Sequence, residues 1–266
     1  MAEISHPFYP IIYVRGYAMT QGEIDDTVAT PYMGFNLGAT KIRQDWEGKV
    51  RRHIFESPLI RLMKDYQYED IYQYGQEKQD NLSPKSVIIY RYYEEADTEL
   101  GRGERPTIPK AAQGLSKLIL ELRDKICKQD PQALQNFKVY LVAHSMGGLV
   151  CRCFLQNPDI GTAESKALVD KVFTYATPHN GIEMAGFNVP DFLRLWDINN
   201  FSREVMAKYL GLPGKPDRVD SLDSKFDPAR FFCLVGTNHK DYTAGAGMSR
   251  KLAGEMSDGK ISWTTG

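Results

Sequence analysis

The stretch KVYLVAHSMGG, residues 138–148, decides the fold. Its short apolar run, Val139–Val142, predicts a buried strand. A helix-compatible segment, Gly148–Gln156, follows almost at once. Between them a serine is flanked by small residues two positions before and two positions after it, in Ala143-His144-Ser145-Met146-Gly147. The stretch therefore predicts a strand, a tight turn and a helix in direct succession.

A serine at such a turn is typical of a nucleophile elbow. We expect side chains larger than these at 143 and 147 to collide where the strand end packs against the helix start. The turn would hold the Ser145 hydroxyl exposed in a strained backbone conformation, with the N–H groups of the helix N-terminus facing a developing oxyanion. Ala143 replaces the usual glycine and is still small. The alternative is an ordinary turn in which Ser145 only caps the helix.

Composition narrows the class of protein. The chain has 266 residues, of which 42% are apolar, and this predicts a single α/β domain over residues 1–266 with insertions at about 19–86 and 181–230. The net charge of −1 and the absence of an arginine-rich stripe argue against nucleic acid as the main partner. Cys127, Cys151, Cys153 and Cys233 form no C-x-x-C pair, which favours buried thiols over disulfides or metal ligands.

The sequence carries neither a membrane-span pattern nor a leader pattern. No apolar run approaches the roughly 20 residues needed to span a bilayer, so we expect no stable membrane insertion. The first ten residues, MAEISHPFYP, show neither a basic nor an apolar leader region. We therefore expect a cytoplasmic protein, with a processed N-terminus as the alternative.

Strand and helix signals alternate along the chain. An amphipathic helix is predicted at Lys110–Lys128, and further strands at Ile11–Val14, Val87–Tyr93, Val169–Tyr175 and Phe231–Val235. This alternation predicts right-handed crossovers and a mostly parallel sheet flanked by helices. Reactive groups of such sheets gather at the carboxyl ends of the strands, where the sequence places Tyr17, Ser145, Pro178 and His239.

Two segments are longer than a simple alternation of strands and helices requires. Met19–Ser86 is expected to hold several helical stretches, including the tyrosine-rich Asp65–Tyr74. Gly181–Arg230 contains an amphipathic stretch, Asp191–Leu210. Such helical insertions could act as lids over an acyl-binding cleft, and the alternative is an ordinary surface helix that packs on the core.

Four motifs in this order carry a family resemblance: IIYVRGY (11–17), AHSMGG (143–148), ATPHNG (176–181) and SDGKI (257–261). Together they resemble the α/β-hydrolases of the bacterial lipase and esterase type, near the PGAP1-like group of serine esterases. The resemblance implies that Ser145 is the nucleophile and that the backbone N–H groups of Met146 and Tyr17 form the oxyanion hole. It also implies that Asp258 is the triad acid, with a turn at Ser-Asp-Gly as the alternative.

The implied activity is hydrolysis of a small-molecule carboxylic ester, with a lipid or acyl ester favoured, through an acyl-enzyme. This chemistry requires no metal or organic cofactor. The alternatives are an acyltransferase or thioesterase, and a catalytically inactive hydrolase fold that serves as a ligand-binding or interaction module.

Two departures from the family pattern concern the oxyanion loop and the base. Arg15 stands where the loop usually has histidine, but the donor there is backbone. The family order is serine, acid, histidine, and no histidine follows Asp258 in this sequence. We therefore expect a base beyond residue 266, on a C-terminal strand and helix that this sequence lacks, with His239 as the fallback base. His144 is expected to point away from the base position, and His179 falls where the family shapes its pocket.

Overall fold

The described residues form an open sheet of six parallel strands. The computed structural model describes residues 4–16, 39–44, 50–55, 57–71, 82–96, 106–181, 201–214 and 217–234. The strand order is β4-β5-β1-β6-β7-β8, and every neighbouring pair is parallel. This confirms the predicted α/β fold class. The strands are β1 (Ile11–Arg15), β4 (Glu69–Asp70), β5 (Ser86–Ile89), β6 (Val139–His144), β7 (Val169–Tyr175) and β8 (Phe231–Leu234).

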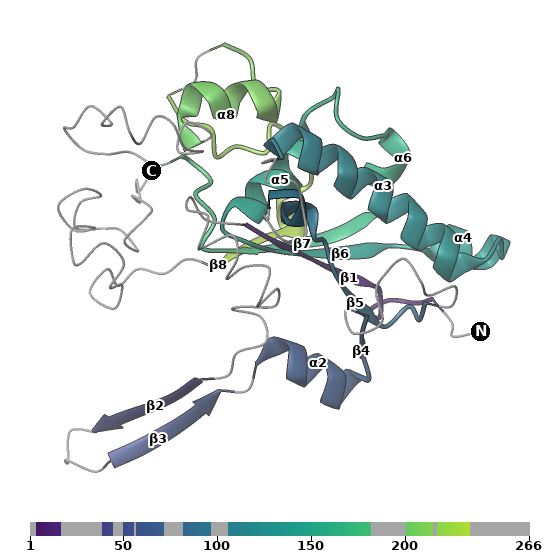
Figure 1. Cartoon of the computed structure of the whole chain (residues 1–266), viewed down its shortest axis with the longest axis vertical. Coiled ribbons are helices and arrows are strands. Elements are labelled where there is room, and N and C mark those ends of the chain that lie inside the picture. The colour runs from purple at the N-terminus through teal and green to yellow at the C-terminus, as the bar shows by residue number, and fades with distance from the viewer. Residues whose placement is uncertain are drawn as a thin grey trace.

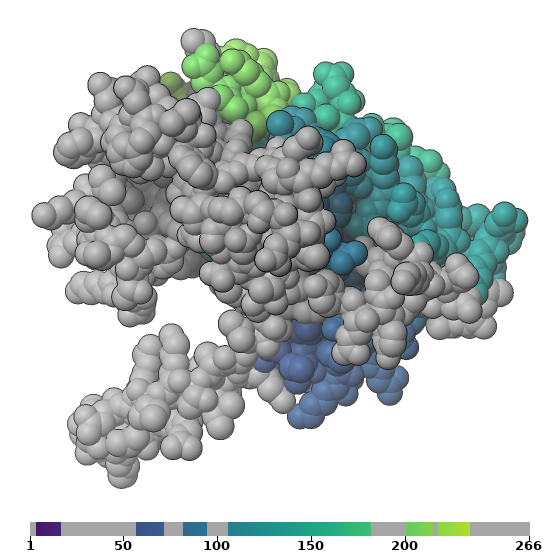
Figure 2. Space-filling view, in the orientation of Figure 1, coloured from purple at the N-terminus to yellow at the C-terminus, as the bar shows by residue number. Residues whose placement is uncertain are grey.

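One face of the sheet is covered by helices (Figure 1). The helix α5 lies against the central strands β1 and β6 and also contacts α3 and α8. It is buried along its whole length, as expected for a helix that is small or apolar on nearly all sides. Apart from α2 (Pro58–Tyr66), the helices of the described residues are α3 (Ile108–Cys127), α4 (Pro131–Asn136), α5 (Met146–Gln156), α6 (Ala163–Ala167) and α8 (Arg203–Leu210). In the space-filling view α3 and α8 form part of the outer surface (Figure 2).

Local sequence explains where α3 begins and ends. The Thr107 side chain accepts a hydrogen bond from the Lys110 N–H, and Pro109 lies in the first turn, where its missing N–H costs nothing. Lys128 ends the helix in the left-handed conformation, at φ 47°. The predicted helix, Lys110–Lys128, thus agrees with the structure to within two residues.

The opposite face carries a second, smaller apolar cluster. Alternate residues of β6 point to different faces: Val139, Leu141 and Ala143 lie in the core beneath α3 and α5, whereas Tyr140 and Val142 belong to the second cluster. That cluster is completed by Leu59 of α2 (Pro58–Tyr66), whose residues are visible below the sheet in Figures 1 and 2.

The insertion predicted at 19–86 differs in part from expectation. The described part of the predicted helix Asp65–Tyr74, residues 65–71, does not continue as a helix: α2 ends at Tyr66, Gln67 adopts a left-handed conformation, and β4 follows. The buried Tyr68 donates a hydrogen bond from its hydroxyl to the Tyr9 carbonyl, so its ring is anchored to the segment before β1 instead of extending α2. The described part also includes an antiparallel hairpin, β2 (Ala39–Gln44) and β3 (Val50–Phe55), which the sequence analysis did not anticipate.

The strand predicted at Val87–Tyr93 ends at Ile89, and a 3₁₀ turn, η3 (Tyr92–Ala96), follows. The Tyr90 N–H still donates to the Tyr13 carbonyl of β1 at 2.9 Å, while its hydroxyl donates to the Ala111 carbonyl of α3 at 2.6 Å. A second 3₁₀ turn, η5 (Pro228–Arg230), precedes β8. The observed strand β5 is therefore shorter than the apolar run that predicted it.

The second insertion is described from Phe201 onward. Its helix α8 buries Met206 and Leu210 in the main core and contacts α5. Ser202 caps its start through the Val205 N–H, and Gly211 ends it in the left-handed conformation. In this part of the segment predicted at Asp191–Leu210, the structure therefore favours the alternative of a helix that packs on the core over a lid.

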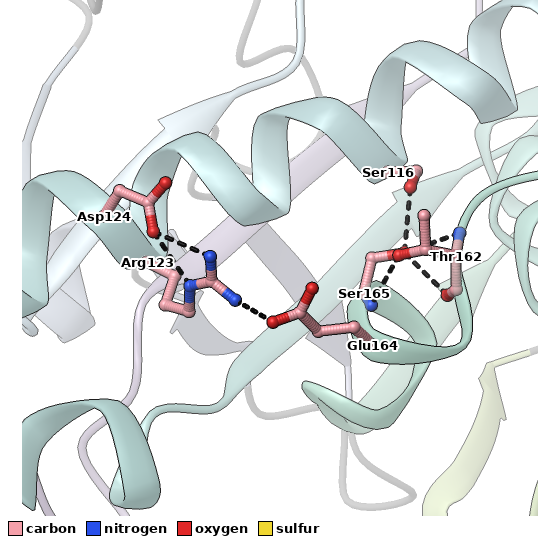
Figure 3. A network of polar contacts seen from close by, with 6 residues as sticks. All are labelled: Ser116, Arg123, Asp124, Thr162, Glu164 and Ser165. Atoms are coloured by element: carbon pink, nitrogen blue, oxygen red, sulfur yellow. Dashed lines mark hydrogen bonds and ion pairs between the residues drawn. The ribbon is translucent and has the colours of Figure 1, made fainter. Parts of the chain in front are cut away.

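A polar network joins α3 to α6 away from the turn at Ser145 (Figure 3). The Ser116 and Ser165 hydroxyls lie 2.8 Å apart, and Ser165 forms a capping box with Thr162 at the start of α6. Arg123 forms an ion pair with Glu164 beside them. These contacts satisfy buried hydroxyls and the first N–H groups of α6, so we assign this network to the packing of the two helices.

The strand order brings the elbow to the reversal point of the sheet. The chain leaves β1 toward β5 and β4 on one side, and leaves β6 toward β7 and β8 on the other. Ligands of open α/β sheets bind at the carboxyl ends of two such strands. The ends of β1 and β6, at Arg15 and His144, are paired in register there.

Candidate active site

Ser145 occupies the sharp turn between β6 and α5. Its backbone has φ 53° and ψ −127°, a conformation that side-chain-bearing residues rarely adopt. The serine stands at the N-cap position of α5, yet its side chain makes no capping hydrogen bond to the described first turn of that helix. The residue is half-buried. A serine that only caps a helix would accept a hydrogen bond from an N–H of the first helical turn. The Ser145 hydroxyl accepts none from the described first turn of α5, and the Ser145 backbone is strained.

The two glycines after the elbow are required by close contacts with other elements. A Cβ at Gly147 would lie 2.0 Å from the Val14 carbonyl oxygen of β1. A Cβ at Gly148 would lie 2.3 Å from the Thr177 hydroxyl oxygen. The expectation of crowding at 147 was correct, but the group it meets is the backbone of β1 and not residue 143.

The end of β1 lies directly against the N-terminus of α5. The Gly16 N–H donates to the His144 carbonyl at 2.9 Å, and a Cβ at Gly16 would come within 2.6 Å of the Met146 nitrogen. The Met146 N–H belongs to the first turn of α5, where helix N–H groups lack intrahelical partners and the helix dipole favours negative charge. The structure thus places Gly16, directly after β1, beside the Met146 N–H, which is the predicted oxyanion donor.

The segment after β7 supports the elbow from the other side. The Ser145 N–H donates to the Tyr175 carbonyl at 3.0 Å, and the Thr177 hydroxyl donates to the Ser145 carbonyl at 2.8 Å. Ala176, between them, has a positive φ of 51°. Both backbone groups of Ser145 are therefore held by residues 175–177, which belong to the motif ATPHNG and the strand before it.

The His179 side chain contacts residues of β7 and β8. Its Nε2 lies 2.9 Å from the Thr174 hydroxyl, and its ring packs edge-on against Phe231. Burial, followed by the nearby Arg152 charge, lowers the pKa of His179 from 6.5 to about 3. It therefore stays neutral at ordinary pH.

Arg152 is a residue that the sequence analysis missed. It lies on α5 and is fully buried, and burial lowers its pKa to about 10, so it remains a cation at neutral pH. Its guanidinium donates to the carbonyls of His179, Val219 and Ser221 and to the Gln156 side chain, at 2.6–2.8 Å. Arg152 thereby ties the elbow helix to the ATPHNG turn and to residues 219–221. A charged residue in the otherwise apolar helical run Gly148–Gln156 was the available signal.

Aromatic and charged side chains surround the carboxyl ends of β1, β6 and β7. The Tyr13 and Tyr175 hydroxyls lie 2.6 Å apart, and the His144 ring lies 4.9 Å from that of Tyr175. Burial raises the pKa of Tyr175 to about 12, so this phenol stays protonated. Arg15 is buried at the end of β1, where it pairs in register with His144, the residue before the elbow serine.

The predicted site residues divide into two groups. Ser145 and Met146 are described and adjacent to Gly16, whereas Tyr17, His239 and Asp258 lie outside the described residues. Within the described ranges, no group of His, Cys, Asp and Glu side chains is arranged to hold a metal ion. No helix in that part of the chain is long and apolar enough to cross a membrane.

A cysteine expectation needs correction at one position. Cys127, Cys151 and Cys153 are buried free thiols as predicted, but Cys233 is exposed on β8. Burial raises the pKa of Cys127 to about 11 and raises those of Cys151 and Cys153 as well, which keeps these thiols protonated.

Comparison with known proteins adds a family match. Residues 109–196 match the model of the PGAP1-like alpha/beta domain. No curated protein matches the chain.

The solved structures that the chain matches include a lipase, a cutinase-like protein and an acetylxylan esterase. The lipase BlEst2 of Bacillus licheniformis is 15% identical, with a TM-score of 0.42 over 97% of this chain and 79% of that one. A cutinase-like protein from Cryptococcus sp. is 14% identical, with a TM-score of 0.35 over 85% and 75%. An acetylxylan esterase is 15% identical, with a TM-score of 0.25 over 41% and 63%. The family match over residues 109–196, together with the parallel sheet that carries this strand–turn–helix unit, supports an α/β-hydrolase fold for the chain.

Proposed function

We propose that this protein is a serine hydrolase that cleaves carboxylic esters, with lipid or acyl esters as substrates, through an acyl-enzyme on Ser145. The observation that carries the proposal is the strained Ser145 backbone, at φ 53° and ψ −127°, at the N-terminus of a buried helix and beside the Gly16 end of β1. Strain of this kind is retained where the surrounding structure enforces it, and it gathers at functional sites.

In the proposed reaction the Ser145 hydroxyl adds to the ester carbonyl carbon while a base takes its proton. The Met146 N–H, and in the proposal the Tyr17 N–H, donate to the developing oxyanion. Collapse of the tetrahedral intermediate expels the alcohol, which takes the proton, and water then hydrolyses the acyl-enzyme by the same steps. We assign the triad acid to Asp258, and the experiments below ask whether His239 is the base.

A fluorophosphonate probe tests the nucleophile directly. The full chain should be labelled, and Ser145→Ala should abolish labelling. Ser202→Ala is a matched control, because Ser202 is also a half-buried serine at a helix N-cap, but its hydroxyl oxygen accepts an ordinary capping hydrogen bond. This control should be labelled like the wild type. Equal labelling of the Ser145→Ala variant would show that the nucleophile lies elsewhere.

Substrate class and the two other triad members are tested by ester hydrolysis. p-Nitrophenyl esters of increasing acyl length should show a preference for longer chains if the substrate is lipid-like. Asp258→Asn and His239→Gln should each lower kcat by about 10⁴-fold or more if the residue belongs to the triad. An unchanged kcat in either variant removes that residue from the mechanism. Added alcohols or thiols that capture most of the acyl group would instead indicate a transferase.

A further inference from the structure

Thr177 makes a contact that the catalytic scheme above does not use. Its hydroxyl donates to the carbonyl oxygen of Ser145 at 2.8 Å, and its side chain is buried. The Gly148 N–H reaches the same carbonyl oxygen at 3.1 Å. The carbonyl of the elbow serine is thus held by two donors from two different elements.

The carbonyl of Ser145 and the N–H of Met146 belong to one planar peptide group. Because this group is trans and rigid, the carbonyl oxygen and the N–H point in opposite directions. A hydrogen bond that fixes the direction of the Ser145 carbonyl therefore also fixes the direction of the Met146 N–H. The same bond limits ψ of Ser145, which stands at the unusual value of −127°.

We propose that Thr177 is a positioning residue that aims the Met146 N–H at the oxyanion through the Ser145–Met146 peptide group. The inference rests on the proposed serine hydrolase function. Thr177 itself touches neither substrate nor nucleophile oxygen in this proposal, so its effect is on orientation alone.

Thr177 is in turn held in place from behind. The His179 N–H donates to the Thr177 carbonyl at 2.9 Å, and the His179 carbonyl accepts from Arg152 at 2.8 Å. The missing side chain of Gly148 leaves the space that the Thr177 side chain occupies, since a Cβ there would meet Thr177 atoms at 2.3–2.9 Å. These contacts restrict rotation of the Thr177 side chain, so its hydroxyl stays directed at the Ser145 carbonyl.

The test compares variants of the full chain that separate the hydroxyl from the volume of the side chain. Thr177→Val keeps the shape and removes the donor, and Thr177→Ser keeps the donor. Thr174→Val is the matched control, because Thr174 is equally buried and its hydroxyl contacts His179 and Phe232 but not the elbow peptide. Thr177→Ala replaces Thr177→Val if the latter does not fold.

We expect Thr177→Val to lower kcat and the rate constant of fluorophosphonate labelling by about 10- to 100-fold, somewhat less than the loss of a whole oxyanion donor. KM should change by less than about threefold, since the interaction is made with the transition state. Thr177→Ser should retain most of the rate. Thr174→Val should lower the melting temperature while keeping the labelling rate. A wild-type rate in Thr177→Val, or an equal loss of rate in Thr174→Val, overturns the inference.

A spectroscopic readout keeps this inference separate from the proposed function. With [¹⁵N]methionine, the Met146 amide signal, assigned by its loss in Met146→Leu, should shift in Thr177→Val and stay in place in Thr177→Ser and Thr174→Val. If the wild type is not labelled by the probe, the proposed function fails. The Met146 signal then decides the inference by itself, and an unmoved signal in Thr177→Val overturns it.

Discussion

Gly147 lies so close to Val14 that a Cβ atom would stand 2.0 Å from the Val14 carbonyl oxygen and 2.7 Å from its carbonyl carbon. Both atoms are backbone of the central strand β1, which is hydrogen-bonded on both sides and cannot give way. The distance between the start of α5 and the end of β1 is thus set by the absence of a side chain. That distance also places Gly16 beside the Met146 nitrogen.

Gly147→Ala should therefore displace the start of α5. We expect a loss of at least about 2 kcal/mol in the free energy of unfolding, as for an overpacked core, together with loss of probe labelling at Ser145. Gly214→Ala is the control: Gly214 has a positive φ of 72°, but no atom of the described residues lies within 4 Å of where its Cβ would stand, so only about 1 kcal/mol of backbone strain is added. Urea unfolding measures both, and equal losses would contradict the steric argument.

The backbone strain at Ser145 predicts an unusual stability order. Glycine accepts a positive φ at no steric cost, so Ser145→Gly should be more stable than Ser145→Ala by about 1 kcal/mol although both are inactive. Ser145→Ala should lose no capping energy, because the Ser145 hydroxyl does not cap the described first turn of α5. By contrast, Ser202→Ala should cost about 1 kcal/mol. Thermal and urea unfolding of the three variants check this order, and a less stable glycine variant would argue against strain.

Arg152→Met should be among the most destabilising single changes in the chain. It removes the Arg152 donor from the buried Val219 carbonyl and from the partly buried His179 carbonyl, and a buried polar group left unsatisfied costs about 1–3 kcal/mol. The Ser221 carbonyl keeps a second donor, the Gln156 side chain. We expect a total loss of at least about 3 kcal/mol. Arg61→Met removes an exposed arginine that pairs with Asp65 and should cost about 0.5 kcal/mol or less. Comparable losses of unfolding free energy in Arg152→Met and Arg61→Met would show that Arg152 does not hold α5 to the ATPHNG turn and to residues 219–221.

His179 predicts a pH dependence of stability. Its pKa is about 3 in the folded protein and 6.5 as the ordinary value, so the unfolded chain binds the proton more readily. Its contribution is complete above about pH 6.5 and is lost as the pH falls toward 3, with a slope of up to about 1.4 kcal/mol per pH unit. The Asp220 carboxyl, whose pKa is lowered by Arg218, acts in the same direction at lower pH. His179→Gln should flatten the dependence between pH 4 and 6.5 in urea titrations, and an unchanged slope would refute this assignment.

The hydrophobic pattern of the sequence predicted most strands of the sheet, because the pattern of each strand lies within one short segment. Val169–Tyr175 was predicted with the observed bounds, and α3 with nearly the observed bounds. The errors lie where a distant contact decides the local structure. Tyr68 is tied to Tyr9, and Tyr90 to Ala111, so neither segment follows its own pattern.

The elbow was predicted from residue types, but its supports were not. The small residue at 147 was expected to matter, whereas the group that it approaches, Val14, comes from a distant part of the chain. The close contact of Gly148 with Thr177 is likewise between distant parts of the chain. Arg152 could be noticed as a charge in an apolar helix, but its three carbonyl partners lie 27 to 69 residues away. The acid and base predicted at Asp258 and His239 stay predictions.

The sequence by itself determined the strand–turn–helix unit around Ser145 and the alternation that produces a parallel sheet, because both depend on interactions between near neighbours in the chain. Only the tertiary structure decided how that unit is held. The strain at Ser145, the direction of its peptide group and the burial of Arg152 each depend on hydrogen bonds and close contacts from β1, from residues 175–179 and from residues 219–221. Such contacts depend on atomic distances across the folded chain, and these leave no periodic signal in the sequence.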